Sequence, residues 1–182
     1  MTNATATQMT ASAIDERTDG NRKEAADPLQ LVSFNVGEEE FAIEILAVQE
    51  IVRMMEITDV PHTPSSVEGV VNLRGQITPV IDLRKRFGMS ANERSQDSRI
   101  IVVEIQGRAL GFIVDNVNEV MRVNASVVEP APAMTTTVRS EYVRGVGKLD
   151  DRLLILLDLD RLFDADDLDH AQLPAEQSAC GE

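Results

Sequence analysis

The sequence predicts an all-β protein of two pseudo-symmetric five-stranded β-barrel subdomains, with a short helix after the last strand of each. Three observations support this: short apolar runs with strand-like alternation, turn residues at regular spacing, and an internal repeat of the whole pattern. We expect a disordered N-terminal arm over residues 1–28 and an acidic tail over 164–182. Between them lies the folded domain, 29–163, with a first barrel over about 29–90 and a second over about 98–163. Exchange of strands between the barrels is left open.

The first half begins with a predicted hairpin. Residues 29–36 alternate, 37–40 form a turn, and 41–45 alternate again. Residues 46–55 fit neither the strand nor the helix period cleanly, and we interpret them as a turn that leads into a third strand.

The stretch Val67–Leu83 organises the rest of this half. It is predicted to form two apolar strands around a turn at Arg74-Gly75-Gln76, followed by a short helix from Asp82 to Phe87. Glycine at such a turn adopts a positive φ without steric cost. We expect the turn to present the side chain of Arg74 to solvent.

The same plan starts again after Ser98, as a strand, a turn and another strand, then a further strand, a proline-containing loop and a last hairpin. We expect strands at 99–105, 109–114 and 117–123, with a turn at 106–107 between the first two. The loop contains Pro130 and Pro132, and the last hairpin ends at Leu159.

The repetition can be verified by subtraction. One set of residues recurs 69 positions later, and Phe41, Ile43, Ile45, Val48, Glu50, Ile51 and Arg53 become Leu110, Phe112, Val114, Val117, Glu119, Val120 and Arg122. A second set recurs 76 positions later, and Val67, Gly69, Val70, Leu73, Ile77, Val80, Asp82, Leu83 and Phe87 become Val143, Gly145, Val146, Leu149, Leu153, Leu156, Asp158, Leu159 and Phe163. Two gap-free blocks of matching positions indicate a duplicated β unit.

Composition excludes several classes of protein. The net charge is −14 and aromatic residues make up 3% with no tryptophan, so the chain lacks the basic patch and stacking platforms of a nucleic-acid binder. Its one cysteine, Cys180, provides no disulfide framework. No run approaches the roughly 18 apolar residues of a membrane span, so we expect a cytoplasmic protein without direct membrane insertion.

The residues for catalysis are also missing from the sequence. His62 and His170 are the only histidines, and no nucleophile–base arrangement or metal-ligand cluster is visible. Asp82 and Asp158 occupy equivalent positions, but an aspartate at the start of a helix is better explained as an N-cap than as a catalytic carboxylate. We therefore expect no catalytic residues, no cofactor and no metal.

In the motifs of its hairpins and loops, the chain resembles the CheW coupling proteins of bacterial chemotaxis over about Leu29 to Phe163. The motifs are Val48-Gln49-Glu50-Ile51, Gly69-Val70-Val71-Asn72-Leu73-Arg74-Gly75, Pro79-Val80-Ile81-Asp82-Leu83, and Pro130-Ala131-Pro132 before Tyr142. The resemblance implies two barrels packed side by side around a hydrophobic core. It also implies a non-catalytic adaptor that joins the cytoplasmic tip of methyl-accepting chemotaxis receptors to the histidine kinase CheA. In this view the adaptor alternates with the kinase's regulatory domain in rings beneath receptor arrays.

The resemblance also implies partner-binding residues. Val48, Glu50 and Arg74 belong to the family pattern associated with coupling. Arg74-Gly75 is replaced by Asp150-Asp151 in the second repeat, so the fold does not require arginine there and the turn is the candidate site. The simpler interpretations are a solvated arginine and a local Glu50–Arg53 ion pair.

A receptor helix is expected in a groove between the barrels, in an amphipathic helix-in-groove mode. Ile77 and Val80 of the first barrel and Val114 of the second are expected to line or support that groove. An adaptor for pilus motility or second-messenger signalling stays open as an alternative function, because the receptor, not the adaptor fold, decides the pathway. An enzyme is the alternative from another class and predicts turnover.

Overall fold

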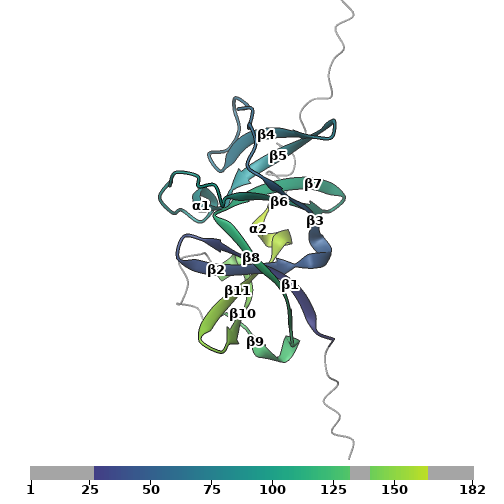
Figure 1. Ribbon diagram of the computed structural model, residues 1–182, viewed down its shortest axis with the longest axis vertical. Helices are drawn as coiled ribbons and strands as arrows, with labels where there is room; N and C mark the ends of the chain where they lie inside the picture. The colour runs from purple at the N-terminus through teal and green to yellow at the C-terminus, as the bar shows by residue number, and fades with distance from the viewer. Residues whose placement is uncertain (1–26, 132–139, 164–182) are drawn as a thin grey trace, which may run out of the picture.

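The computed structural model describes residues 27–131 and 140–163 (Figure 1). Pro132, the acidic tail and all of the N-terminal arm except residues 27 and 28 lie outside the described residues. The all-β prediction is confirmed, because strands dominate and the helices are single turns. The strands are β1 (Leu29–Val36), β2 (Glu39–Glu44), β3 (Val48–Arg53), β4 (Val67–Leu73), β5 (Gln76–Asp82), β6 (Arg99–Ile105), β7 (Arg108–Val114), β8 (Asn116–Val123), β9 (Val128–Glu129), β10 (Val143–Leu149) and β11 (Arg152–Leu157). The helices are α1 (Leu83–Arg86) and α2 (Leu159–Leu162), and the 3-10 turns are η1 (Ile45–Ala47), η2 (Ala125–Val127) and η3 (Ser140–Tyr142).

The strands form two sheets that lie one above the other in Figure 1. The five-stranded sheet has the order β3-β6-β7-β5-β4, and the six-stranded sheet has the order β8-β1-β2-β11-β10-β9. The sheets do not follow the halves of the chain. The hairpin β1–β2 joins strands of the second half, and its repeat equivalent β6–β7 joins strands of the first half.

The exchanged hairpins dock in the same way in both sheets. Each adds one parallel pairing: Val80 on β5 opposes Gly111 on β7, and Leu156 on β11 opposes Ala42 on β2. These pairs are related by the 76- and 69-residue offsets of the sequence repeat. The structure therefore repeats the duplicated unit down to the register of its strands.

Both short helices begin at a capping aspartate, as predicted. Asp82 accepts from the backbone N–H groups of Arg84 and Lys85 at 2.8 and 3.5 Å. Asp158 accepts from the N–H groups of Asp160 and Arg161 at 3.1 and 3.3 Å. Both carboxylates satisfy otherwise unpaired donors of a first helical turn, which explains why both repeats contain aspartate there.

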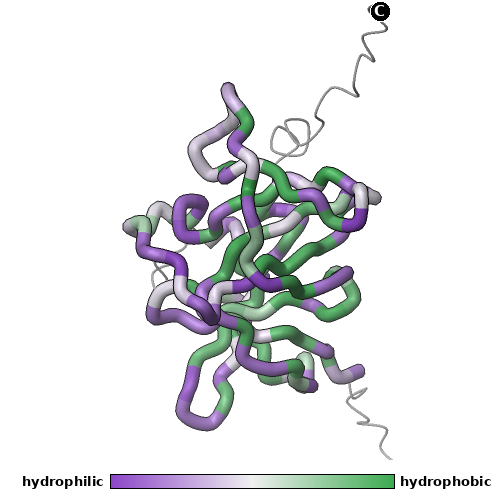
Figure 2. Tube along the Cα trace, turned by 45° about the horizontal axis from the view of Figure 1, so that its top comes forward, coloured by the Kyte–Doolittle hydropathy of each residue, from purple (hydrophilic) through white to green (hydrophobic). Residues whose placement is uncertain are grey.

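A central core lies between the sheets, and a smaller core lies within each of them. Aromatic side chains of the central core join each short helix to the exchanged hairpin of the same half of the chain. Phe87, which follows α1, packs on Phe41 of β2 with ring centroids 5.1 Å apart, and Phe163, which follows α2, packs on Phe112 of β7 at 6.3 Å. Hydrophobic stretches run along the interior strands, whereas many peripheral turns are hydrophilic (Figure 2). Burial of these apolar side chains is the main force that holds the sheets together.

Candidate functional site

The turn between β4 and β5 has the conformation that its sequence predicts. Arg74 and Gly75 both have positive φ, 53° and 84°, which is the pattern of a two-residue type I′ hairpin turn. The N–H of Gly75 donates to Oδ1 of Asn72 at 2.9 Å, which steadies the turn. The side chain of Arg74 is 84% exposed, so the turn presents it to solvent as expected.

The carboxylate of Glu50 holds this arginine. Arg74 Nη2 lies 2.9 Å from Glu50 Oε2, and the Glu50 side chain is mostly covered. Glu50 therefore pairs with Arg74, 24 residues away, and the local Glu50–Arg53 pair is not formed. Since β3 and β4 are the two edges of the five-stranded sheet, this ion pair links the edges of the sheet. A cavity of about 350 Å³ opens beside the pair.

The other candidate residues divide into surface and interior positions. Ile77 is 49% exposed, and Val48 is partly exposed where it packs against the central core. Val80 and Val114 are fully buried, so neither side chain lines a surface groove. All of these residues lie in the five-stranded sheet, because the exchanged hairpin brings Val114 on β7 into the same sheet as Val80. The two valines can only support a surface from beneath.

The six-stranded sheet carries an equivalent ion pair that the sequence comparison missed. Glu119 on β8 is the repeat equivalent of Glu50, and it accepts a hydrogen bond from Arg152. Arg152 also lies 3.4 Å from Glu40. The hydrogen bond to Glu119 and the charge of Glu40 raise the pKa of Arg152. In the six-stranded sheet, Arg152 thus pairs with Glu119 as Arg74 pairs with Glu50 in the five-stranded sheet. Arg152 lies two residues after Asp150, the position that aligns with Arg74.

Exposed apolar side chains also occur as equivalent pairs. Ile51 and Ile77 of the five-stranded sheet are 39% and 49% exposed. Their repeat equivalents in the six-stranded sheet, Val120 and Leu153, are 58% and 61% exposed. The sequence repeat contained a signal for these exposed pairs, because both halves have an apolar residue at each of the two positions. All four side chains nevertheless face outward. We name Ile51 and Ile77 the first apolar pair, and Val120 and Leu153 the second apolar pair.

The two connections between the sheets differ. Asp115, between β7 and β8, receives Arg84 Nε at 2.9 Å and Nη2 at 2.5 Å, and also the N–H of Gly37 at 2.7 Å. The hydrogen bond to Asp115 raises the pKa of Arg84. The equivalent residue in the other connection is Leu46 in η1, which is 92% exposed. The connection at Asp115 is therefore clamped, that is, held to helix α1 by hydrogen bonds, whereas the connection at Leu46 exposes an apolar side chain to solvent.

A shallow cavity adjoins the second connection. It measures about 300 Å³ and is lined by Glu44, Ala47, Arg144, Leu157, Asp158, Leu159 and Asp160. Arg144 forms an ion pair with Glu44 across it. The apolar leucine next to charged walls suits an amphipathic partner better than a small reactive substrate.

The described part of the chain contains no group of three His, Cys, Asp or Glu side chains placed to hold a metal ion. His62 is an exposed turn residue with a φ of 65°. Within residues 27–131 and 140–163, no helix is long and apolar enough to cross a membrane.

Comparison with known proteins identifies relatives along nearly the whole described region. A family model described as "CheW-like domain" matches residues 30–167. The chain is 37% identical over 139 residues to "Chemotaxis protein CheW" of Klebsiella aerogenes, covering 76% of this chain and 84% of that protein. It is 38% identical over 138 residues to "Chemotaxis protein CheW" of Helicobacter pylori, covering 76% of this chain and 83% of that one.

A solved structure agrees with these sequence matches. The fold is similar to that of the scaffolding protein TtCheW from Thermoanaerobacter tengcongensis, with a TM-score of 0.71 and 44% sequence identity. The similarity covers 77% of this chain and 90% of that one.

Proposed function

The chain belongs to the CheW family, and we propose that it couples methyl-accepting chemoreceptors to the histidine kinase CheA. By family membership it is a non-catalytic scaffolding protein of chemotaxis signalling. The observation that carries the proposal is the family motif around Arg74, which the fold places at an exposed turn and holds with Glu50. We further propose that the protein acts in the cytoplasm, recruited to receptor arrays at the membrane.

The kinase contact is proposed to use the outward faces of the two sheets. The regulatory domain of CheA has the same fold in this proposal, so apolar positions on one protein meet their counterparts on the other. The first and second apolar pairs support this, because they are exposed at equivalent positions of both sheets. Glu50, Arg74, Gly75 and Ile77 are the proposed kinase-contact residues of the five-stranded sheet, and Val48 belongs to the proposed receptor contact. An exposed charge pair beside apolar anchors contributes partner choice more than affinity.

The receptor contact is proposed at the connection that carries Leu46. An amphipathic helix from the receptor tip buries this leucine and the neighbouring Val48, which already packs on the central core. The clamped connection at Asp115 offers no such apolar side chain. Val80 and Val114 support the sheet beneath the contact and do not touch the partner.

Reconstitution of the purified protein with a receptor cytoplasmic fragment and CheA tests the proposal. We expect a ternary complex and receptor-dependent control of CheA autophosphorylation. Absence of a complex, together with unchanged autophosphorylation, would overturn the proposal. Turnover of a small-molecule substrate by the adaptor alone would contradict its non-catalytic role.

A further inference from the structure

Arg53 on β3 and Arg99 on β6 lie directly opposite each other, as the last pair in the register of these two strands. Directly opposed residues of an antiparallel pair have their side chains on the same face, with Cβ atoms about 4.5–5.5 Å apart. Arg53 is exposed and Arg99 is half-buried. We name these two residues the arginine pair. Because like charges at this spacing repel each other, the arginine pair is an unfavourable contact of the five-stranded sheet.

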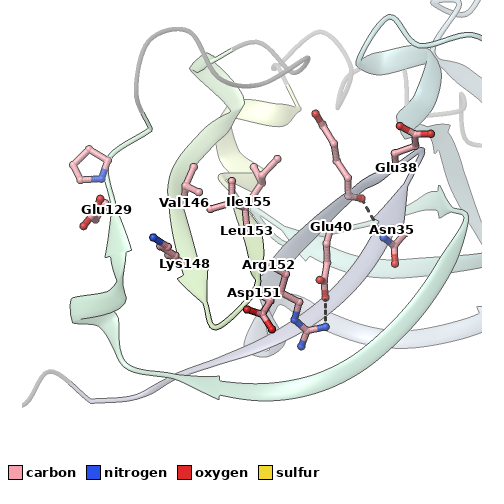
Figure 3. A pocket seen from close by; sticks show the side chains of 12 residues that line it. Asn35, Glu38, Glu40, Glu129, Val146, Lys148, Asp151, Arg152, Leu153 and Ile155 are labelled. Carbon is pink, nitrogen blue, oxygen red and sulfur yellow. Dashed lines mark hydrogen bonds and ion pairs between the residues drawn. The ribbon is translucent and has the colours of Figure 1, made fainter.

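Arginines elsewhere in this acidic protein are neutralised by carboxylates. Arg152, for example, lies 3.4 Å from Glu40, and Figure 3 draws this ion pair beside the β10–β11 hairpin. Carboxylates also hold Arg74, Arg84, Arg94, Arg144 and Arg161. An arginine without such a partner is therefore unexpected in a chain with a net charge of −14.

The arginine pair has no acidic partner of this kind. Within residues 27–131 and 140–163, Arg53 forms no hydrogen bond or ion pair. Arg99 donates only from Nη1, to the backbone carbonyls of Gln96 and Ser98, both at 2.8 Å. The carboxylate of Asp97, in the same segment, pairs with neither arginine in the described part of the chain. The two carbonyl bonds orient the guanidinium group of Arg99, and its Nε and Nη2 have no acceptor there.

The repeat supplies an acceptor at the equivalent place in the six-stranded sheet. The residues 69 positions from Arg53 and Arg99 are Arg122 on β8 and Gln30 on β1, which oppose each other in the same register. With its amide oxygen turned toward the arginine, Gln30 accepts from Nε and Nη2 of Arg122 at 3.2 and 3.3 Å. In the five-stranded sheet Arg99 replaces this glutamine, so a second donor lies where the other half has an acceptor. The duplicated fold therefore does not require the second arginine.

We propose that the arginine pair binds a phosphoryl dianion, whose oxygens replace the missing amide acceptor. A phosphate monoester carries a charge of about −1.5 to −2 at pH 7 and has three acceptor oxygens. It therefore matches two guanidinium groups in charge and offers oxygens to both forks, whereas one carboxylate would neutralise only one of them. Neither arginine belongs to the receptor or kinase contacts proposed above, and the inference does not depend on them.

Titration calorimetry of the full chain with inorganic phosphate, at constant ionic strength, tests the proposal. We expect saturable binding with a Kd on the order of 1 mM or lower. Arg53→Gln re-creates an arginine–glutamine pair like that of the other sheet and should weaken binding at least about tenfold. Its melting temperature should not fall, because Arg53 makes no hydrogen bond or ion pair within the described residues. Arg122→Gln is the matched control: it removes the repeat equivalent of Arg53 and should leave phosphate binding unchanged.

Two further titrations distinguish the sources of the phosphoryl group. Phenyl phosphate represents a free monoester, and the peptide Ala-Ala-phosphoserine-Ala-Ala represents a phosphorylated protein segment. Binding of the peptide at least about tenfold tighter than that of phenyl phosphate assigns the site to a phosphorylated protein, and any smaller difference assigns it to a free ester. Absence of saturable phosphate binding, parent-level binding by Arg53→Gln, or an equal loss in Arg122→Gln would overturn the proposal.

Discussion

Arg86 donates hydrogen bonds from Nε and Nη2 to the backbone carbonyl of Leu162, at 3.1 and 2.7 Å. These two residues occupy equivalent positions of the repeat, 76 residues apart. The guanidinium group of Arg86 also lies over the ring of Tyr142, 5.5 Å from its centroid. The end of α1 is thereby fastened to the end of α2, so a single side chain connects the two halves at their helices.

Arg86→Ala should lower the free energy of unfolding by about 1–3 kcal/mol, since a partly buried carbonyl loses its charged donor. Urea unfolding measures this change. Arg161→Ala is the matched control, because the Arg161 side chain is 69% exposed and pairs only loosely with Asp158, at 3.5 Å. Its effect should stay below about 0.5 kcal/mol. Equal effects of the two substitutions would contradict the proposed role of Arg86.

Substitutions in the two connections between the sheets should have opposite effects on stability and on receptor binding. Asp115→Ala removes the partner of Arg84 and an acceptor of Gly37, and should cost about 1–3 kcal/mol of unfolding free energy. Leu46→Ser alters a side chain that is almost fully exposed, so unfolding should change by less than about 0.5 kcal/mol. Leu46→Ser should instead weaken binding of a receptor cytoplasmic fragment, measured by calorimetry. A large stability loss with intact receptor binding would contradict the proposed role of Leu46.

Acid sensitivity should depend on Glu68. Burial raises the pKa of this carboxyl, but the hydrogen bond from Lys85 and the charge of Arg94 outweigh it, so its pKa lies below the ordinary value. Because the folded pKa is lowered, the stabilisation is fully present above about pH 5 and is lost as the pH falls through the lowered pKa. Glu68→Gln should therefore be less stable than the parent at pH 7, and the difference should shrink in acid. Chemical unfolding at both pH values measures it, and an equal difference at pH 7 and pH 3 would rule out this account.

Local signals made much of the fold predictable. Alternation and turn residues located the hairpin Val67–Leu83, and the capping role of Asp82 and Asp158 required only the residues around them. Periodicity does not say which sheet a hairpin joins, so the sequence alone does not predict the exchange of β1–β2 and β6–β7.

The sequence did not predict that Val80 and Val114 are buried, and the reason is a different one. Four consecutive residues of β5, 78–81, are buried, because this interior strand is covered on both faces. In such a strand, alternation does not distinguish a surface position from a core position. The Glu50–Arg74 pair was likewise beyond the sequence, since it depends on two sheet edges that approach each other only in the folded chain.

We propose that the turn at Arg74 contacts a partner and does not hold the fold together. Arg74 is exposed, and its ion pair with Glu50 is a surface pair, so its loss should cost less than about 1 kcal/mol of unfolding free energy. A Glu50→Arg/Arg74→Glu double variant can re-form the pair with its charges exchanged. If the partner reads the positive charge at the turn, this exchange should not restore function.

The most direct measurement is CheA autophosphorylation in the reconstituted assembly of receptor fragment, kinase and adaptor, with the melting temperature of each adaptor variant recorded alongside. For Arg74→Glu we predict a loss of receptor-dependent kinase control of about tenfold, with a nearly unchanged melting temperature and no rescue by the double variant. Kinase control at the parent level, or a large fall in the melting temperature, would contradict the claim.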